Sequence, residues 1–177
     1  ERVSPNEQIK APSDVEQVTG SNLHLKPGET VSARDMLYAL MVRSANDGAY
    51  AVAHHISGSV PAFSQLMNER ALQLGCLDTN FNNPNGLNDD LHTTTAYDLA
   101  LIAREAMKYP DFRDAAKTKV KKIARSMNQE DTVLVSKNKV LKSDPTADGI
   151  KTGYTRPSGY CYVGSATRNG YRIITVV

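Results

Sequence analysis

The sequence predicts an α+β fold in which helices come first and an antiparallel sheet follows. Between residues 32 and 109 the apolar residues recur at the spacing of amphipathic helices, whereas from residue 117 onward they alternate as they do in strands. In addition, Asn169-Gly170 joins the stretches 159–167 and 171–177, and this dipeptide is a strong indicator of a tight hairpin turn.

The length, composition and net charge are those of an ordinary globular chain. At 177 residues it can bury a hydrophobic core, and we expect residues 1–177 to form a single domain. The content of 40% hydrophobic and 23% charged residues argues against disorder. The net charge of +2 is small, and the lysines of residues 117–125 alternate with apolar residues as on a solvated strand face, so no nucleic-acid partner is expected. No apolar run approaches the roughly 18 residues that a membrane span needs, and residues 1–30 lack the apolar region of a signal peptide.

The cysteines and histidines favour neither a metal nor a cofactor. Cys76 and Cys161 lie far apart and outside any metal-binding spacing. A disulfide between them is one interpretation, and two buried free thiols are the preferred one. The four histidines, including the adjacent His54 and His55, form no i, i+4 pair with another ligand type. We expect no metal ion and no cofactor.

The first two helices follow a polar, turn-rich segment at residues 1–31. Ser32 opens the first helix, with Asp35 three residues later in the manner of a capping box, and this helix should reach about Arg43. The second helix should begin near Asn46 and end before Gly58.

Two further helices and four strands complete the prediction. The third helix should run from Pro61 to Leu74, and a turn-rich loop at residues 80–92 leads to the fourth. Thr94 or Thr95 should cap that fourth helix, which runs to about Tyr109 and is stopped by Pro110. The segments in which apolar residues alternate as in strands are 117–124, 131–141, 159–167 and 171–177.

Ser44 and Asn46 interrupt the apolar pattern between the first two helices. One interpretation is structural, because serine and asparagine side chains bond to local backbone at corners and cap the helix that follows. The other is functional. On a straight helix the two side chains would point about 200° apart, whereas a corner can turn both toward one cleft.

A second polar segment, Lys151-Thr152-Gly153, favours the functional interpretation. Ser-x-Asn and Lys-Thr-Gly are two of the three motifs of penicillin-binding proteins and class A β-lactamases. Three longer stretches, 23–56, 81–110 and 147–177, resemble the serine D-alanyl-D-alanine carboxypeptidases, the low-molecular-weight penicillin-binding proteins. The resemblance implies the serine β-lactamase and DD-peptidase-like transpeptidase fold.

The third motif of that family, Ser-x-x-Lys, holds the nucleophile and should lie before Ser44, yet no serine there has a lysine three residues later. The chain's own match, Ser136 to Lys139, falls in a predicted strand, where the lysine cannot lie one helical turn from the serine. We therefore interpret Ser136 as a decoy. We expect the nucleophile to precede Glu1 or to lie on a separate chain, and these residues, the central and C-terminal part of a catalytic domain, to be inactive alone.

The resemblance implies acyl transfer. A serine attacks the carbonyl between the two terminal D-alanines of a peptidoglycan stem peptide, D-alanine leaves, and water releases the acyl-enzyme. Ser44 would relay a proton to the leaving amine, Asn46 would fix the substrate backbone, and Lys151 would place positive charge near the terminal carboxylate. β-Lactam antibiotics would bind at the same site.

The substrate would lie along the Lys-Thr-Gly strand as an added strand. By the same resemblance, the backbone N–H of Tyr154 would be one donor of the oxyanion hole. The residues that would bind substrate on this strand are Thr152, Gly153, Tyr154 and Thr155.

The same motifs leave two alternative functions. A non-catalytic relative that binds or organises the cell wall would share the motifs without the nucleophile. A serine β-lactamase would share the fold, but residues 82–100 contain no glutamate of the kind that deacylates a β-lactam, and they resemble a carboxypeptidase instead. The substrate implies a location outside the cytoplasmic membrane.

Overall fold

The chain forms the predicted α+β structure, with most helices before Ala116 and most strands after it. This computed structural model describes residues 3–127 and 132–177. In chain order the elements are β1 (Gln8–Lys10), η1 (Val15–Gln17), β2 (Thr30–Ser32), α1 (Ala33–Tyr38), η2 (Ala39–Arg43), α2 (Asn46–Ser57), α3 (Val60–Gln73), α4 (Ala96–Ala106), α5 (Pro110–Ala116), β3 (Val120–Ile123), β4 (Thr132–Val135), α6 (Lys139–Ser143), β5 (Ala147–Thr155), β6 (Gly159–Arg168) and β7 (Tyr171–Val176).

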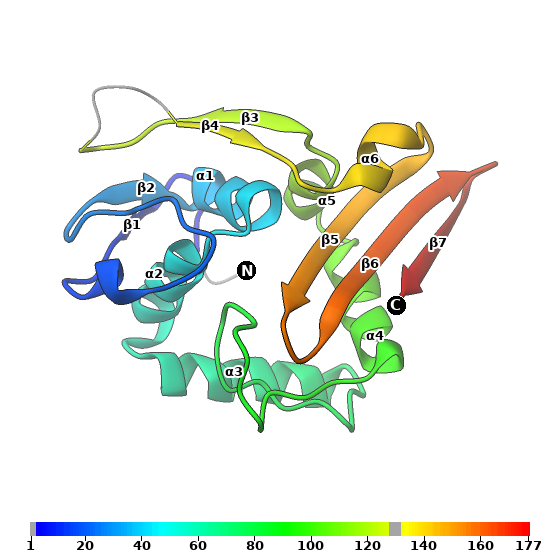
Figure 1. Cartoon of the computed structure of the whole chain (residues 1–177), viewed down its shortest axis with the longest axis horizontal. Helices are drawn as coiled ribbons and strands as arrows, with labels where there is room; N and C mark the ends of the chain where they lie inside the picture. The colour runs from blue at the N-terminus through cyan, green and yellow to red at the C-terminus, as the bar shows by residue number, and fades with distance from the viewer. Residues whose placement is uncertain (1–2, 128–131) are drawn as a thin grey trace.

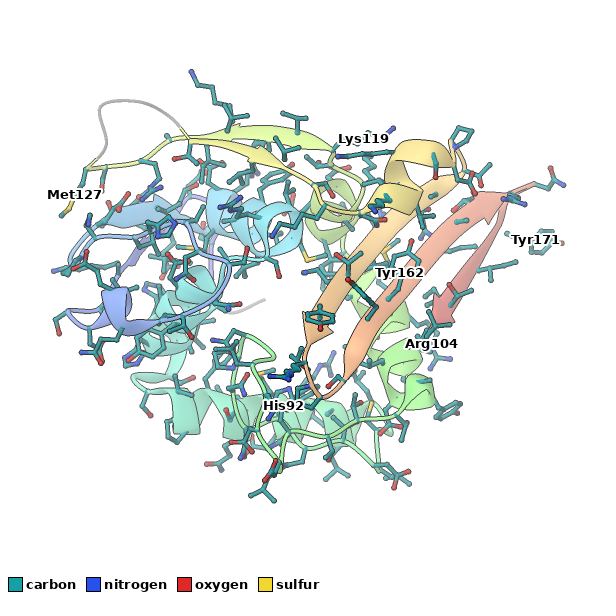
Figure 2. All side chains as sticks on the ribbon, viewed as in Figure 1. His92, Arg104, Lys119, Met127, Tyr162 and Tyr171 are labelled. Carbon is teal, nitrogen blue, oxygen red and sulfur yellow. The ribbon has the colours of Figure 1, made fainter. Side chains whose placement is uncertain are left out.

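The C-terminal strands form an antiparallel sheet in the order β5-β6-β7, so β5 lies at an edge. The predicted hairpin is confirmed, since Arg168 pairs with Tyr171 across Asn169 and Gly170, whose φ angles of 50° and 80° are both positive, as a type I′ turn requires. Figure 1 shows this orange and red sheet on one side and the blue and cyan N-terminal elements on the other. Tyr162 of β6 reaches across to β5, where its hydroxyl donates to the Gly149 carbonyl at 3.1 Å (Figure 2).

The first helices begin where the sequence predicts, but one of them winds differently. The Ser32 hydroxyl accepts the Asp35 N–H at 3.1 Å, which confirms the cap, and α2 ends at Ser57 before a left-handed Gly58. The predicted helix to Arg43 is divided, because residues 39–43 form the π-helix η2. The short strands β1 and β2, which pair with each other, were not predicted within the turn-rich segment.

Two predictions about the middle of the chain are wrong. The fourth helix, capped by Thr95, ends at Ala106, and Pro110 does not end a helix but begins α5, where its missing N–H has no cost. The strand predicted over 131–141 ends at Val135. Asn138 then caps α6 by accepting the Leu141 N–H at 3.2 Å, and the predicted first residue of that strand, Asp131, lies outside the described residues.

Among the described residues, the buried core has two parts. One joins the N-terminal segment and α1 to the β3–β4 hairpin, and its largest fully buried apolar side chains are Val15, Leu25, Val31, Met36, Ile123 and Leu134. The other lies between α4 and the C-terminal sheet and contains Ala103, Met107 and Ile150. Cys76 is buried and Cys161 is exposed, and both are free thiols, so the predicted burial of Cys161 is wrong.

A third apolar region is a cavity of about 800 Å³ between α1, α2, α3, α4 and α5. Many of the apolar side chains on the predicted helices are half-buried because they face this space. Its apolar lining includes Leu37, Leu40, Val52, Ile56, Phe63, Leu66, Met67, Leu74, Ile102, Ala106 and Phe112.

Candidate active site

Ser44 lies at a corner between two helical elements, η2 and α2, as the sequence predicts. Its backbone is left-handed, with φ 63° and ψ 47°, a conformation that is uncommon outside glycine and that recurs at functional sites. The Ala45 N–H still bonds back to the Ala39 carbonyl at 3.2 Å, and Asn46 opens α2. The chain therefore turns sharply at Ser44, without a long loop.

Asn46 is fixed by the N-terminal segment that runs beside the corner. Its backbone N–H donates to the Ser21 carbonyl at 2.7 Å, and its side-chain Nδ2 donates to the Thr19 carbonyl at 2.9 Å. Between these two carbonyls, Gly20 has a φ of +92°, and a Cβ there would lie 2.5 Å from Asn46 Nδ2. A glycine is needed at this position for both reasons.

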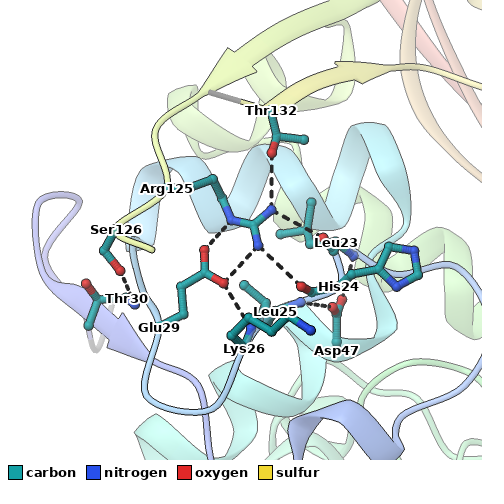
Figure 3. A network of polar contacts seen from close by, with 10 residues as sticks. All are labelled: Leu23, His24, Leu25, Lys26, Glu29, Thr30, Asp47, Arg125, Ser126 and Thr132. Carbon is teal, nitrogen blue, oxygen red and sulfur yellow. Dashed lines mark hydrogen bonds and ion pairs between the residues drawn. The ribbon is translucent and has the colours of Figure 1, made fainter. Parts of the chain in front are cut away.

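Asp47 ties the same segment to α2 one residue further on. Its buried carboxylate accepts the backbone N–H groups of Leu23 and Leu25, each at 3.0 Å. The carbonyls of Leu23 and His24 accept in turn from the guanidinium of Arg125, at 3.2 and 3.5 Å (Figure 3). The corner is thus connected to Arg125, which lies just beyond the end of β3.

Arg125 forms a buried ion pair with Glu29, and the two side chains are 1% and 0% exposed. Nη2 of Arg125 lies 2.9 Å from Oε2 of Glu29, and Nε lies against Oε1. Although burial opposes the charged form, hydrogen bonds from Arg125 and from the Lys26 N–H keep the pKa of Glu29 below its usual value. This pair holds the β3–β4 hairpin onto the loop between Leu23 and Glu29.

Lys151 reaches the corner from the edge strand β5. Its Nζ donates to the Ser44 hydroxyl at 2.8 Å and to the Thr152 carbonyl at 2.7 Å. Burial, followed by the positive charge of Lys137, lowers the pKa of Lys151 to about 8. The structure therefore brings Ser44 and Lys151, 107 residues apart in the sequence, into direct contact.

Beside this contact lies a small cavity of about 20 Å³. The loop between β4 and α6 forms part of its wall, which the sequence analysis did not place at the site. A buried side-chain amide in this loop, Nδ2 of Asn138, has no hydrogen-bond partner among the residues that the structure describes. The lining residues are Met41, Val42, Arg43, Ser44, Ser136, Lys137, Asn138, Ile150, Lys151 and Thr152.

Ser136 also borders this cavity, and its environment differs from that of an attacking serine. Its hydroxyl accepts the Asn138 N–H at 3.2 Å, and its backbone N–H donates to the Lys119 carbonyl at 2.8 Å. The interpretation of Ser136 as a decoy stays a prediction, and this position gives the hydroxyl a structural use.

The other residues predicted to bind substrate lie along β5. Thr152 lines the small cavity, and Gly153 and Tyr154 are exposed at the strand edge. The Tyr154 ring packs against Tyr160 of β6, with ring centres 4.7 Å apart. The Thr155 hydroxyl accepts the Ser158 N–H at 3.1 Å, which stabilises the β5–β6 turn.

Within residues 3–127 and 132–177, no three His, Cys, Asp or Glu side chains come together in a way that could hold a metal ion. No helix of these residues has the length and apolar character that a membrane span requires.

The fold is that of solved DD-peptidase structures. The crystal structure of the Streptomyces K15 DD-transpeptidase has a TM-score of 0.92 and 31% identity to this chain, and the match covers 99% of this chain and 72% of that one. A D-alanyl-D-alanine carboxypeptidase structure from Mycobacterium tuberculosis has a TM-score of 0.91 at 29% identity, and its match covers 99% of this chain and 67% of that one.

The chain belongs to the D-alanyl-D-alanine carboxypeptidase family, peptidase family S11, which it matches over residues 1–177. It is 34% identical to the carboxypeptidase DacF of Bacillus subtilis, over 99% of this chain and 45% of that protein. It is 37% identical to a D-alanyl-D-alanine carboxypeptidase of Streptomyces sp. K15, over 89% of this chain and 57% of that protein. It therefore spans about half the length of these relatives.

Proposed function

We propose that these residues form one wall of the active site of a serine D-alanyl-D-alanine carboxypeptidase, which removes the terminal D-alanine from peptidoglycan stem peptides through an acyl-enzyme. The observation that carries the proposal is the 2.8 Å hydrogen bond between Lys151 Nζ and Ser44 Oγ, in a chain that matches the family over residues 1–177. In this proposal residues 1–177 belong to a single catalytic domain.

Acyl transfer needs a proton to move from the attacking serine to the departing amine. The Ser44 hydroxyl can both accept and donate, so it can pass this proton to the leaving D-alanine. Lys151, with its pKa lowered to about 8, can exchange a proton with Ser44 close to neutral pH and can stabilise the oxygen while the proton moves. Asn46, held by two carbonyls, offers the substrate a fixed amide.

The substrate would pair with β5, because an edge strand presents unpaired backbone groups to an extended peptide. Gly153 is exposed on that strand and has no side chain to obstruct the approach of a peptide backbone. The N–H of Tyr154 would be one donor to the oxyanion, and the loss of such a donor typically costs about 10²–10³-fold in rate.

The attacking serine must come from outside these 177 residues, on the same polypeptide or on a separate one, because their single Ser-x-x-Lys begins at Ser136. The apolar cavity supports this part of the proposal. Side chains from five helices surround about 800 Å³, and an apolar helix in that space would complete their burial. We propose that such a helix carries the nucleophile.

A β-lactam would acylate the same serine, since it offers a strained carbonyl and a carboxylate at similar positions. The substrate is a component of the cell wall, so we infer an extracytoplasmic location, in the periplasm or cell envelope, and a contribution to peptidoglycan maturation and cell shape.

The test uses the protein expressed from its whole coding sequence. It is incubated with a fluorescent penicillin, and the labelled peptide is identified by mass spectrometry. In parallel, release of D-alanine is measured from a peptide that ends in D-Ala-D-Ala. We expect one stable adduct on the serine of a Ser-x-x-Lys motif, together with D-alanine release that requires Ser44.

Other results would contradict the proposal in distinguishable ways. A folded protein that gives neither adduct nor D-alanine would be the non-catalytic, cell-wall-binding relative. Rapid turnover of the penicillin, without D-alanine release, would indicate a β-lactamase. An adduct on Ser136 would show that the decoy interpretation is wrong.

A further inference from the structure

The loop from Ser136 to Asn138 brings a second lysine to the site. The β3–β4 hairpin delivers this loop, because Ile123 and Leu134 of the hairpin are buried in the same core as Met36 of α1. Lys137 therefore lines the small cavity together with Ser44 and Lys151.

The two lysines differ in how their ammonium groups are used. Lys151 is partly buried and directs two of its three donors to the Ser44 hydroxyl and the Thr152 carbonyl, so one donor remains. Lys137 is exposed, and the contact of its Nζ is a long one of 3.5 Å to the Ser21 hydroxyl. Lys137 thus has donors to offer a ligand.

The Lys137 ammonium group lies beside Ser21, a residue that also holds the corner around Ser44. The Ser21 hydroxyl donates to the Arg43 carbonyl at 3.0 Å, and the Ser21 carbonyl accepts the Asn46 N–H at 2.7 Å. Nζ of Lys137 therefore lies over the segment that fixes Asn46, on the same side of the corner as the cavity.

The charge around the cavity favours an anion. Within residues 3–127 and 132–177, its lining contains three basic residues, Arg43, Lys137 and Lys151, and no acidic one. The carboxylate next to the corner, Asp47, is buried and accepts backbone N–H groups with both oxygens, so it does not neutralise the lining at close contact. The charge of Lys137 is also felt by Lys151, whose pKa it helps to lower.

We propose that Lys137 is the residue that binds the C-terminal carboxylate of the substrate, while Lys151 serves Ser44. This inference rests on the proposed function and assigns a separate cation to each task. It differs from the sequence-based expectation, in which Lys151 placed positive charge near the terminal carboxylate. It also gives a function to the segment around Ser136, which as a nucleophile motif has none.

The test compares Lys137→Met with Lys137→Arg in the protein expressed from its whole coding sequence, with Lys139→Met as the control because Lys139 is exposed at the start of α6. Each protein receives one peptide ending in D-Ala-D-Ala as the free acid and as the amide. We expect Lys137→Met to raise KM for the free acid about tenfold or more, with kcat little changed and with the amide unaffected. Lys137→Arg should keep most of the preference for the acid.

An unchanged preference for the free acid in Lys137→Met, in a protein that still forms the penicillin adduct, would overturn the inference and leave the proposed function intact. If the unaltered protein neither forms an adduct nor releases D-alanine, the proposed function fails. Lys137 is then judged by NMR titration with acetyl-D-Ala-D-Ala and its amide. Tighter binding of the acid that is lost in Lys137→Met would support the inference, and equal binding of both peptides would overturn it.

Discussion

The corner around Ser44 and the apolar cavity lie on neighbouring parts of the same helices. The polar groups of the corner have bonding partners, whereas the space of the cavity is unfilled by the described residues. At the corner, Asn46 and Asp47 are held by carbonyls and N–H groups of residues 19–25, and Arg125 anchors that segment in turn. In the cavity, side chains of α1 to α5 surround about 800 Å³ that no described side chain fills. The chain builds its polar wall by itself, whereas its apolar centre has room for another element.

Polar bonding and apolar packing specify geometry in different ways. Polar groups fix geometry through directional bonds, and those bonds are present around Ser44 and Lys151. Apolar packing fixes geometry only when the space is filled. In the proposed function, these residues therefore set the side of the site that relays the proton, whereas the position of the attacking serine depends on the helix proposed to fill the cavity.

The largest expected effect is on the rate of acylation and comes from a substitution at the corner itself. Ser44→Ala should slow acylation by penicillin about 10²–10⁴-fold, the range for loss of a positioned proton-transfer group. Ser136→Ala should change the rate little, because that hydroxyl accepts a backbone N–H within its own loop. Stopped-flow fluorescence with a labelled penicillin measures both rates, and equal losses in the two variants would contradict the account.

The next effect is on the free energy of unfolding and tests the buried Arg125–Glu29 ion pair. Arg125→Ala should lower the free energy of unfolding by about 3–5 kcal/mol, because it leaves Glu29 buried without its partner. The control is Glu16→Ala, which removes a pair with Lys26 whose side chains are 54% and 59% exposed and should cost less than about 1 kcal/mol. Urea unfolding gives both values, and a small loss for Arg125→Ala would mean that the buried pair does not hold the segment.

The third prediction addresses the apolar cavity. If another helix fills it in the protein expressed from its whole coding sequence, Leu66→Ala should cost about 2–5 kcal/mol, like other large-to-small changes in a core. Leu72→Ala on the same helix is the control, because Leu72 is 65% exposed and should cost little. Equal urea midpoints for the two variants would show that the cavity is open to solvent.

Gly20→Ala tests the segment beside the corner, because the added Cβ strains the backbone and displaces Asn46. We expect a loss of about 1–3 kcal/mol from the positive φ, with slower penicillin labelling in addition. Gly28→Ala shares the positive φ, but its Cβ would meet only side-chain atoms at 3.6 and 3.8 Å, so labelling should persist. If both variants label equally fast, the Thr19 to Ser21 segment does not control the site.

The smallest effect depends on pH. The folded state lowers the pKa of Lys151 from 10.5 to about 8, so between these values the unfolded chain binds more protons than the folded one. Stability contributed by this group therefore rises as the pH increases from about 8 to 10.5, by about 1–3 kcal/mol. Urea unfolding of the unaltered protein should show this rise relative to Lys151→Met, and parallel curves would contradict the shift.

The sequence predicted the elements that local patterns encode. The corner between the first two helices, the Thr95 cap and the Asn169-Gly170 hairpin all follow from side chains that bond within a few residues. The π-helix η2, the start of α5 at Pro110 and the cap of α6 at Asn138 were missed, because each pattern is also compatible with a different local structure.

The site was predicted in part. The resemblance to a family predicted that Ser44 and Lys151 belong to one site. The structure places Lys151 Nζ 2.8 Å from Ser44 Oγ. Lys137 and Gly20 were not predicted to lie there, because their positions depend on contacts between distant segments. The one indication was the Ser136-Lys137-Asn138-Lys139 sequence itself, which matches the Ser-x-x-Lys pattern but follows Ser44 in the chain and lies between β4 and the first residue of α6.

The contact between Lys151 and Ser44 can be tested by an NMR titration of the Lys151 side chain, with and without Ser44→Ala, in the protein expressed from its whole coding sequence. A lysine held against Ser44 and shielded from water should titrate with a midpoint near 8, and this midpoint should move when the hydroxyl is removed. A midpoint near the ordinary value of 10.5, unchanged by Ser44→Ala, would show that the two side chains do not share a site.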